Sequence, residues 1–198
     1  MASGRQRTFN KEQALSHAMK VFWLKGFAGA SLSDLVEAMG INKPSLYAAF
    51  GNKESLFIST LEYYVETVGA SHFDNLISPN ESVPNKIGAY LESISKAVLN
   101  SALPGGCFVV NSTCESGSDC LTAETKQAVE KINSDSKNAF IDFFEKEKRK
   151  GNITSTSSPE ALADYLMATQ FGIAVLARNK ATPQQLQHVI ENAVAAFQ

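Results

Sequence analysis

The sequence has few of the residues from which catalytic and metal sites are usually built. It contains three cysteines and three histidines in 198 residues, and the histidines lie far apart in the chain. The cysteines lack the paired C-x-x-C spacing of a structural zinc site, and their odd number argues against a disulfide scaffold. No phosphate-binding, dinucleotide-binding or G-x-S-x-G motif occurs. The sequence therefore gives no reason to expect an enzyme, a bound metal or a cofactor.

Long apolar runs are also absent. The longest, residues 171–177, is too short to cross a bilayer, and the first seven residues lack the apolar core of a signal peptide. The hydrophobic fraction of 44% and the charged fraction of 19% are typical of a soluble globular protein. We therefore expect a cytoplasmic protein that makes no membrane contact.

The net charge of −2 is unevenly distributed along the chain. Residues 1–60 hold seven Lys and Arg against four Asp and Glu, a net charge of +3, and the remaining residues carry −5. A basic N-terminal segment on an acidic body is typical of a DNA-reading domain attached to a part that does not touch DNA. A difference of this size also arises by chance, so the charge pattern needs support from motifs.

Residues 31–57 predict two short helices joined by a tight turn, with a third helix starting directly after them. Ser31 can cap the first helix, since apolar residues follow it at helical spacing. Gly40 supplies the left-handed residue that ends this helix, and Asn42 is the next cap. This order of caps and breaks predicts a helix-turn-helix.

The second of these helices is too short to be stable alone in water, so its neighbours must hold it. Leu46 and Phe50, four residues apart, are its expected anchors. Its other face carries polar side chains that can reach a phosphate or a base edge: Lys43, Ser45 and Tyr47. In a helix-turn-helix, the second helix enters the major groove of DNA.

Several stretches together resemble the DNA-binding signature of the TetR/AcrR family of bacterial repressors, over roughly residues 8–57. They are Ser31-Leu-Ser-Asp-Leu35, Gly40-Ile-Asn-Lys43, Ser45-Leu-Tyr-Ala-Ala-Phe50 and Gly51-Asn-Lys-Glu-Ser-Leu-Phe57, preceded by Ala18, Phe22 and Lys25-Gly26-Phe27. The rest of the chain resembles the family in length and helical character alone.

The resemblance implies roles for individual residues. Lys43, Ser45 and Tyr47 would face the major groove, while Ser31, Tyr47 and Lys53 would contact phosphates. Pro44 stands where the family often has a small residue, so it would make an apolar contact such as one with a thymine methyl group.

The N-terminal arm carries two further cations, Arg5 and Arg7. They could grip a phosphate or a minor groove, or belong to a disordered tail.

Beyond the head, helical periodicity predicts an all-α body. The expected helices cover roughly residues 52–68, 84–100, 107–114, 121–150, 161–177 and 186–197. With the N-terminal helices, the chain should contain about nine. We expect a helix-turn-helix DNA-binding domain in residues 1–54 and a larger ligand-binding and dimerisation domain in residues 55–198.

The last two helices predict a homodimer. The segment 161–177 is apolar or small on almost every face, which indicates a helix covered on all sides. One side could be covered by a second copy, giving a four-helix interface around a two-fold axis. The alternative is a core within one chain. The expected interface residues are Leu162, Leu166, Gly172, Ala174, Leu186, Val189, Ile190 and Val194.

The body also supplies candidates for a ligand pocket. Most are aromatic residues, each of which could equally belong to the core. Asn111 and Gln170 are polar residues in apolar segments, where a polar group needs a partner. The candidates are Tyr64, Phe108, Asn111, Phe140, Phe144, Tyr165, Gln170 and Phe171.

Cys107 is a separate candidate, as a sensor of electrophiles or oxidants. It follows two glycines, and family members that sense electrophiles use a cysteine in such a place. A position in the first turn of a helix would favour the thiolate. The alternative is a cysteine that packs as a small hydrophobic residue.

By resemblance, the chain is a ligand-responsive regulator, released from a palindromic operator on double-stranded DNA by an unknown small-molecule effector. One alternative is a DNA-binding regulator without a small-molecule ligand. Others are a regulator triggered by modification of Cys107, or an enzyme fused to a DNA-binding head. An enzyme would need clustered titratable residues in the body, which the sequence lacks. A cavity in the body would favour the ligand-responsive regulator.

Overall fold

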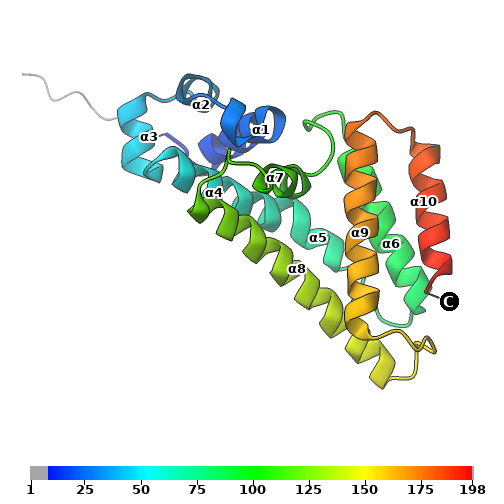
Figure 1. The fold of residues 1–198 in the computed structure, drawn as a ribbon. Helices are drawn as coiled ribbons and strands as arrows, with labels where there is room; N and C mark the ends of the chain where they lie inside the picture. Colours follow the sequence, from blue (N-terminus) through cyan, green and yellow to red (C-terminus); the bar gives the residue numbers. More distant parts are fainter. Residues whose placement is uncertain (1–8, 198) are drawn as a thin grey trace, which may run out of the picture.

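The structure, a computed structural model, describes residues 9–197, so Arg5 and Arg7 of the predicted DNA-gripping arm lie outside the described residues. Within this range the chain forms helices and no strand (Figure 1). The helices are α1 (Lys11–Gly29), α2 (Leu32–Met39), α3 (Lys43–Phe50), α4 (Lys53–Tyr64), the π-helix η1 (Val65–Gly69), α5 (Ala70–Phe73), α6 (Val83–Val98), α7 (Phe108–Ser116), α8 (Ala123–Arg149), α9 (Pro159–Arg178) and α10 (Pro183–Ala195).

The helix α4, the π-helix η1 and α5 form one continuous helical segment. Val65 and Ala70, at the two junctions, both keep right-handed helical backbone angles. Counted this way, residues 9–197 contain nine helices, and the prediction of an all-α chain with about nine helices is confirmed. None of these helices has the length and apolar character needed to span a bilayer.

The helices of the N-terminal head begin where the sequence places their caps. The side chains of Asn10, Ser31, Asn42 and Asn52 each accept a hydrogen bond from the backbone N–H three residues further on, at 2.8–3.0 Å. A cap of this kind stabilises a helix by about 1 kcal/mol. Gly40 ends α2 with a φ of 65°. Local sequence therefore sets the helix-turn-helix of α2 and α3.

Two buried clusters form the core. One packs α1–α4 of the head against α7, with Phe57 and Phe108 fully buried between them. The other joins α6, α8, α9 and α10 in the body. Since α4 runs across the predicted boundary at residues 54 and 55 and carries much of the first cluster, the packing of the head continues into the body. The domain division stays a prediction.

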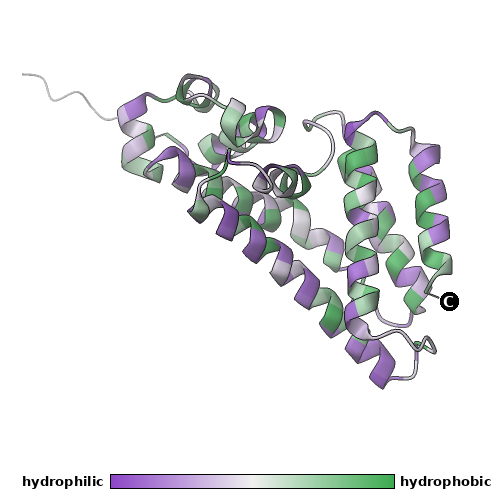
Figure 2. Ribbon diagram, in the orientation of Figure 1, coloured by the Kyte–Doolittle hydropathy of each residue, from purple (hydrophilic) through white to green (hydrophobic). Residues whose placement is uncertain are grey.

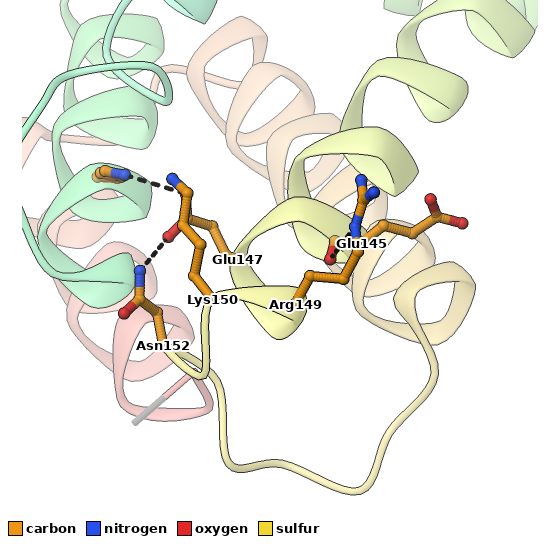
Figure 3. Close-up of polar contacts among 6 residues, drawn as sticks. Glu145, Glu147, Arg149, Lys150 and Asn152 are labelled. Carbon is orange, nitrogen blue, oxygen red and sulfur yellow. Dashed lines mark hydrogen bonds and ion pairs between the residues drawn. The ribbon is translucent and has the colours of Figure 1, made fainter.

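A buried ion pair joins α6 to the end of α8, and no pattern in the sequence predicts it. Lys86 Nζ lies 3.3 Å from the Glu147 carboxylate, which also accepts hydrogen bonds from Lys150 at 2.8 Å and Asn152 at 2.6 Å (Figure 3). Burial alone would raise the pKa of Glu147, but these hydrogen bonds lower it to about 2. The carboxylate therefore stays ionised and fixes the far end of α8.

The helix α3 and the last two helices lie at opposite ends of the molecule, and the long helix α8 runs from one end toward the other (Figure 1). The end of α9 reaches α1 of the head, where Arg178 donates a hydrogen bond to the Trp23 carbonyl oxygen at 3.4 Å. Hydrophobic and hydrophilic residues alternate around α8, whereas hydrophobic residues are frequent along α9 and α10 (Figure 2). This arrangement leaves α3 at one tip of the molecule, far from the outer face of α9 and α10.

Candidate DNA-binding surface and internal cavity

The short helix α3 has one buried and one exposed face. Leu46 and Phe50 are 0% and 7% exposed and anchor α3 to the head, as predicted. On the other face Tyr47 is 48% exposed. The structure also places three predicted contact residues away from the core: Lys43 and Pro44 are exposed and Ser45 is half-buried. The polar face of α3 is therefore open to a large partner.

Ser31 is already engaged within the head. Its hydroxyl accepts a hydrogen bond from the Asp34 N–H at 3.0 Å, and its backbone N–H donates to the Asp34 carboxylate at 3.0 Å, which makes a capping box. The hydroxyl also donates to this carboxylate at 2.8 Å. Lys25 lies 2.7 Å from the same carboxylate and, with Ser31, lowers the pKa of Asp34 to about 2. The structure thus gives Ser31 a capping role, and its predicted phosphate contact stays a prediction.

Lys53 stands in the first turn of α4, where free N–H groups and the helix dipole favour an anion. Its ammonium lies 4.5 Å from the centre of the Phe27 ring, and its half-buried position lowers the pKa of the side chain. A lysine held in this way has less freedom than an extended surface lysine. Its position beside the helix N-terminus suits a phosphate oxygen.

The body contains a cavity of about 390 Å³ between η1 and helices α4 to α9. Tyr64, Gln170 and Phe171, which were predicted from the sequence as pocket residues, line it, and so does Cys107. The π-helix η1 contributes Val65 and Gly69 to the wall. Such π segments are frequent at functional sites because they displace side chains from regular helical register.

Five predicted pocket residues are absent from this wall, and the pocket assignment is corrected for them. Phe108 packs in the core of the head, and Phe140 and Phe144 are fully buried in the core of the body. Tyr165 is 42% exposed on the outside of α9. Asn111 lies on α7 beside the cavity-lining segment, and its buried amide nitrogen has no hydrogen-bond partner among the described residues.

Two polar contacts on the wall of the cavity were not predicted from the sequence. The Tyr90 hydroxyl, on α6, donates a short hydrogen bond to the Gln170 side-chain oxygen on α9. The His72 Nδ1 atom lies 2.6 Å from the Ser93 hydroxyl.

The wall of the cavity carries little charge. Within residues 9–197 no Lys or Arg lines it, and burial lowers the pKa of His72, which keeps the imidazole neutral at pH 7. Asp135, the one carboxylate among the described lining residues, is paired with Lys131 at 2.5 Å. The cavity is therefore suited to an uncharged, largely apolar molecule rather than to an anion.

Cys107 differs from the sequence expectation. It is the N-cap of α7 rather than a member of its first turn, and its thiol accepts a hydrogen bond from the Tyr64 hydroxyl at 3.3 Å. Burial raises the pKa of the thiol and outweighs the hydrogen bonds that favour the thiolate. The surroundings of Cys107 therefore favour the neutral thiol rather than the thiolate, and the residue lines the cavity.

Five of the eight predicted interface residues lie in the core of their own chain, so their assignment is corrected: Leu162, Leu166, Ala174, Leu186 and Ile190 are at most 6% exposed. They offer almost no surface to a second chain. A shallow groove beside them contains Gly172 and Val189, together with Tyr165 and Leu176. Val194 is half-buried and packs near Gly88.

The groove belongs to an apolar strip along the outside of α9. Tyr165 and Leu176 line the groove and are 42% and 40% exposed, and the neighbouring Val175 is 43% exposed, so α9 leaves three large apolar side chains open to solvent. The sequence could not assign residues to the two sides of α9, because its apolar character extends all round.

Comparisons with known proteins support both parts of this arrangement. A family model described as bacterial regulatory proteins of the tetR family matches residues 14–60, and one described as the tetracyclin repressor-like C-terminal domain matches residues 84–193. The HTH-type transcriptional repressor ComR of Escherichia coli K12 is 30% identical over 190 residues, which cover 94% of this chain and 88% of ComR. BdcR, a repressor from the same organism, is 50% identical over 54% of each chain.

A solved structure is similar over almost the whole length. CifR, described as a TetR family transcriptional regulator, superposes with a TM-score of 0.89 and is 32% identical, covering 98% of this chain and 100% of that one. That structure is of a mutant with three cysteines replaced, in complex with a 26-base-pair double-strand operator DNA.

Proposed function

The chain belongs to the TetR family of bacterial transcriptional regulators, and we propose that it is a repressor that binds a palindromic DNA operator as a homodimer and releases it when a small molecule enters the cavity. The observation that carries this proposal is the two-sided character of α3, whose polar face stays open while Leu46 and Phe50 hold it to the head. The operator-bound CifR structure supports DNA as the partner.

In this proposal α3 enters the major groove, where Lys43, Ser45 and Tyr47 contact bases and phosphates. Pro44 supplies the apolar contact. The N-termini of α2 and α4, with Ser31 and Lys53, receive phosphates on either side of the groove. Arg5 and Arg7 would extend the basic surface from the N-terminal arm.

A second copy of the chain is the proposed occupant of the groove between α9 and α10. A single helix of eight residues reads few base pairs, whereas two copies related by a two-fold axis read both halves of a palindrome. The exposed apolar strip of Tyr165, Val175 and Leu176 gives the two copies a surface to bury. The helices α9 and α10, which form the groove, lie at the opposite end of the molecule from α3 (Figure 1). Pairing through the groove therefore leaves both α3 helices free for DNA.

The proposed effector is an uncharged, largely apolar molecule. The cavity volume of about 390 Å³ lies within the range of small-molecule sites, and the described lining lacks a cation that could pair with an anionic ligand. Gln170 and Tyr90 offer polar atoms that can fix the orientation of one hydrogen-bonding group on the ligand.

A large side chain that fills the cavity should prevent release by the effector without weakening DNA binding. Ala97 lines the cavity from α6, so Ala97→Phe should keep operator affinity within about twofold but abolish release by neutral compounds. The measurement is operator release in a panel of neutral aromatic alcohols and ketones, with their carboxylate analogues as anionic counterparts. Ala89→Phe, on the exposed side of the same helix, is the matched control. Release of the Ala97→Phe complex by compounds that also release the wild type would contradict the cavity as the effector site.

A second trigger is favoured by the position of the Cys107 thiol on the cavity wall. An activated alkene held in the cavity would add the Cys107 thiol across its double bond: a bond forms between sulfur and one carbon, the π bond breaks, and the thiol proton ends on the other carbon. The added bulk would press on Tyr64 of α4, whose hydroxyl lies 3.3 Å from the sulfur. In a background with Cys114 and Cys120 replaced by Ser, N-ethylmaleimide should release the operator, and the further change Cys107→Ser should prevent release. Release that persists without Cys107, or full alkylation of Cys107 without release, would exclude this trigger.

A further inference from the structure

The helix α1 is interrupted three residues before its end. Gly26 has a φ of 72° and a ψ of 172°, outside the helical region, and the chain then resumes one more turn to Gly29. A residue with a side chain is strained at this φ. Because of this interruption, the N–H of Phe27 does not donate the regular hydrogen bond within α1.

A carboxylate on α7 accepts a hydrogen bond from this N–H instead. Glu115, near the C-terminal end of α7, accepts a hydrogen bond from the Phe27 N–H at 2.9 Å, across 88 residues of sequence. The contact is close: a Cβ atom at position 26 would lie 1.8 Å from Glu115 Oε1. The glycine at the break and the carboxylate therefore fit each other.

The turn held by Glu115 carries part of the proposed DNA-binding surface. The Phe27 ring is buried, packs edge-on against Phe57 with ring centres 5.1 Å apart, and lies under the Lys53 ammonium at 4.5 Å. The negative charge of Glu115 also favours the charged form of Lys53. A shift of the turn would move Phe27, and with it the first turn of α4.

The other end of α7 faces the cavity. Val109 and Val110, in its first turn, line the cavity, and so does its N-cap residue Cys107. The nine-residue helix α7 thus contacts the cavity through residues at its beginning and the α1 backbone through Glu115 near its end, while Phe108 in its first turn packs in the core of the head. Among the described residues, Glu115 is the side chain of α7 that bonds to the α1 backbone.

We propose that Glu115 is a positioning residue for DNA binding, which holds the turn at Gly26 and Phe27 so that α1 and the start of α4 keep the spacing required by the operator. This inference rests on the proposed function. A displacement of α7 by a ligand in the cavity would reach the turn at Gly26 through this contact, beside the packing of Phe108 against Trp23 and Phe57.

Two substitutions distinguish the effect of the length of the Glu115 side chain from the effect of its charge. Glu115→Asp keeps the charge but shortens the side chain by one methylene, so the carboxylate no longer meets the Phe27 N–H. Glu115→Gln removes the charge but keeps an oxygen at the same reach. We expect Glu115→Asp to weaken operator binding about tenfold, and Glu115→Gln to bind as well as the wild type or more tightly. Removing a negative charge from a DNA-binding chain favours binding, so only loss of position explains a loss in the Asp variant.

The test is an operator titration of both variants at a fixed salt concentration, with Glu130→Gln on the exposed face of α8 as the control for charge. Hydrogen exchange of residues 24–31 is measured on the same samples and should quicken in Glu115→Asp alone. Wild-type affinity in Glu115→Asp, or equal losses in the Asp and Gln variants, would overturn the inference. If the wild-type chain binds no operator, the proposed function fails instead, and the exchange measurement still reports on the contact.

Discussion

Gly172→Arg should yield a folded monomer that binds the operator roughly a thousandfold more weakly than the wild type, because joining two half-site contacts in one particle raises the observed affinity by two to four orders of magnitude. Apart from the backbone of α9 itself, no described atom lies within 4 Å of the position that a Cβ would occupy at Gly172, so a side chain can begin there without a clash. It would, however, place a charge in the groove where a second copy is proposed to pack.

Light scattering gives the mass of the variant, and thermal unfolding shows whether it is folded. Gly172→Ala is the matched control, since it adds one methyl group without charge and should remain a dimer. Replacing a helical glycine raises helix stability by up to about 1 kcal/mol, so neither variant should unfold earlier than the wild type. A dimeric Gly172→Arg chain with unchanged operator affinity would show that the two copies pair elsewhere.

Lys43→Ala and Tyr47→Phe should each weaken operator binding by about a hundredfold. Removing a phosphate or base contact costs roughly 1–3 kcal/mol, and in a dimer the substitution acts in both half-sites. Both side chains are on the open face of α3, so neither change should disturb the packing of the head. Lys53→Ala should act in the same direction, with an added effect on the packing of Phe27.

The salt dependence distinguishes a phosphate contact from a base contact. Each phosphate contact that a substitution removes makes the slope of log affinity against log salt shallower by about one unit. Lys96→Ala, which removes an exposed lysine from the body, is the control for charge. Operator affinities that are unaffected by the α3 substitutions would remove α3 from the DNA interface.

The helix-turn-helix could be predicted from sequence because its determinants are local. The caps at Ser31, Asn42 and Asn52 act over three residues, and Gly40 sets its own turn. The side of α3 that faces outward followed from the spacing of Leu46 and Phe50. Such interactions need no knowledge of how distant segments pack.

The cavity could not be predicted in the same way. Phe140 of α8 lies in the core, while Phe171 of α9 lines the cavity, and both are large aromatic residues on apolar helical stripes. Which of them faces open space depends on the π-helix η1 and on the angle between helices, neither of which leaves a pattern in the sequence. Cys107 is a further example, because burial by distant residues reversed the pKa shift expected from its place near a helix N-terminus.

Five of the eight predicted interface residues were misassigned for a related reason. An apolar helix shows that it is covered, but it does not show by what. Leu166 is covered by its own chain, whereas Leu176, further along the same helix, is left open.

The central claim, a dimer that reads a palindrome, is tested most directly by the mass of the protein–DNA complex. A palindromic duplex selected from a random-sequence library by the wild-type chain is mixed with that chain, and the mass of the complex is measured by light scattering, beside a duplex carrying one half-site. We predict two chains on the palindrome, and binding to the half-site duplex that is at least about a hundredfold weaker. One chain on each duplex, or equal affinity for the palindrome and for a scrambled duplex, would contradict the account.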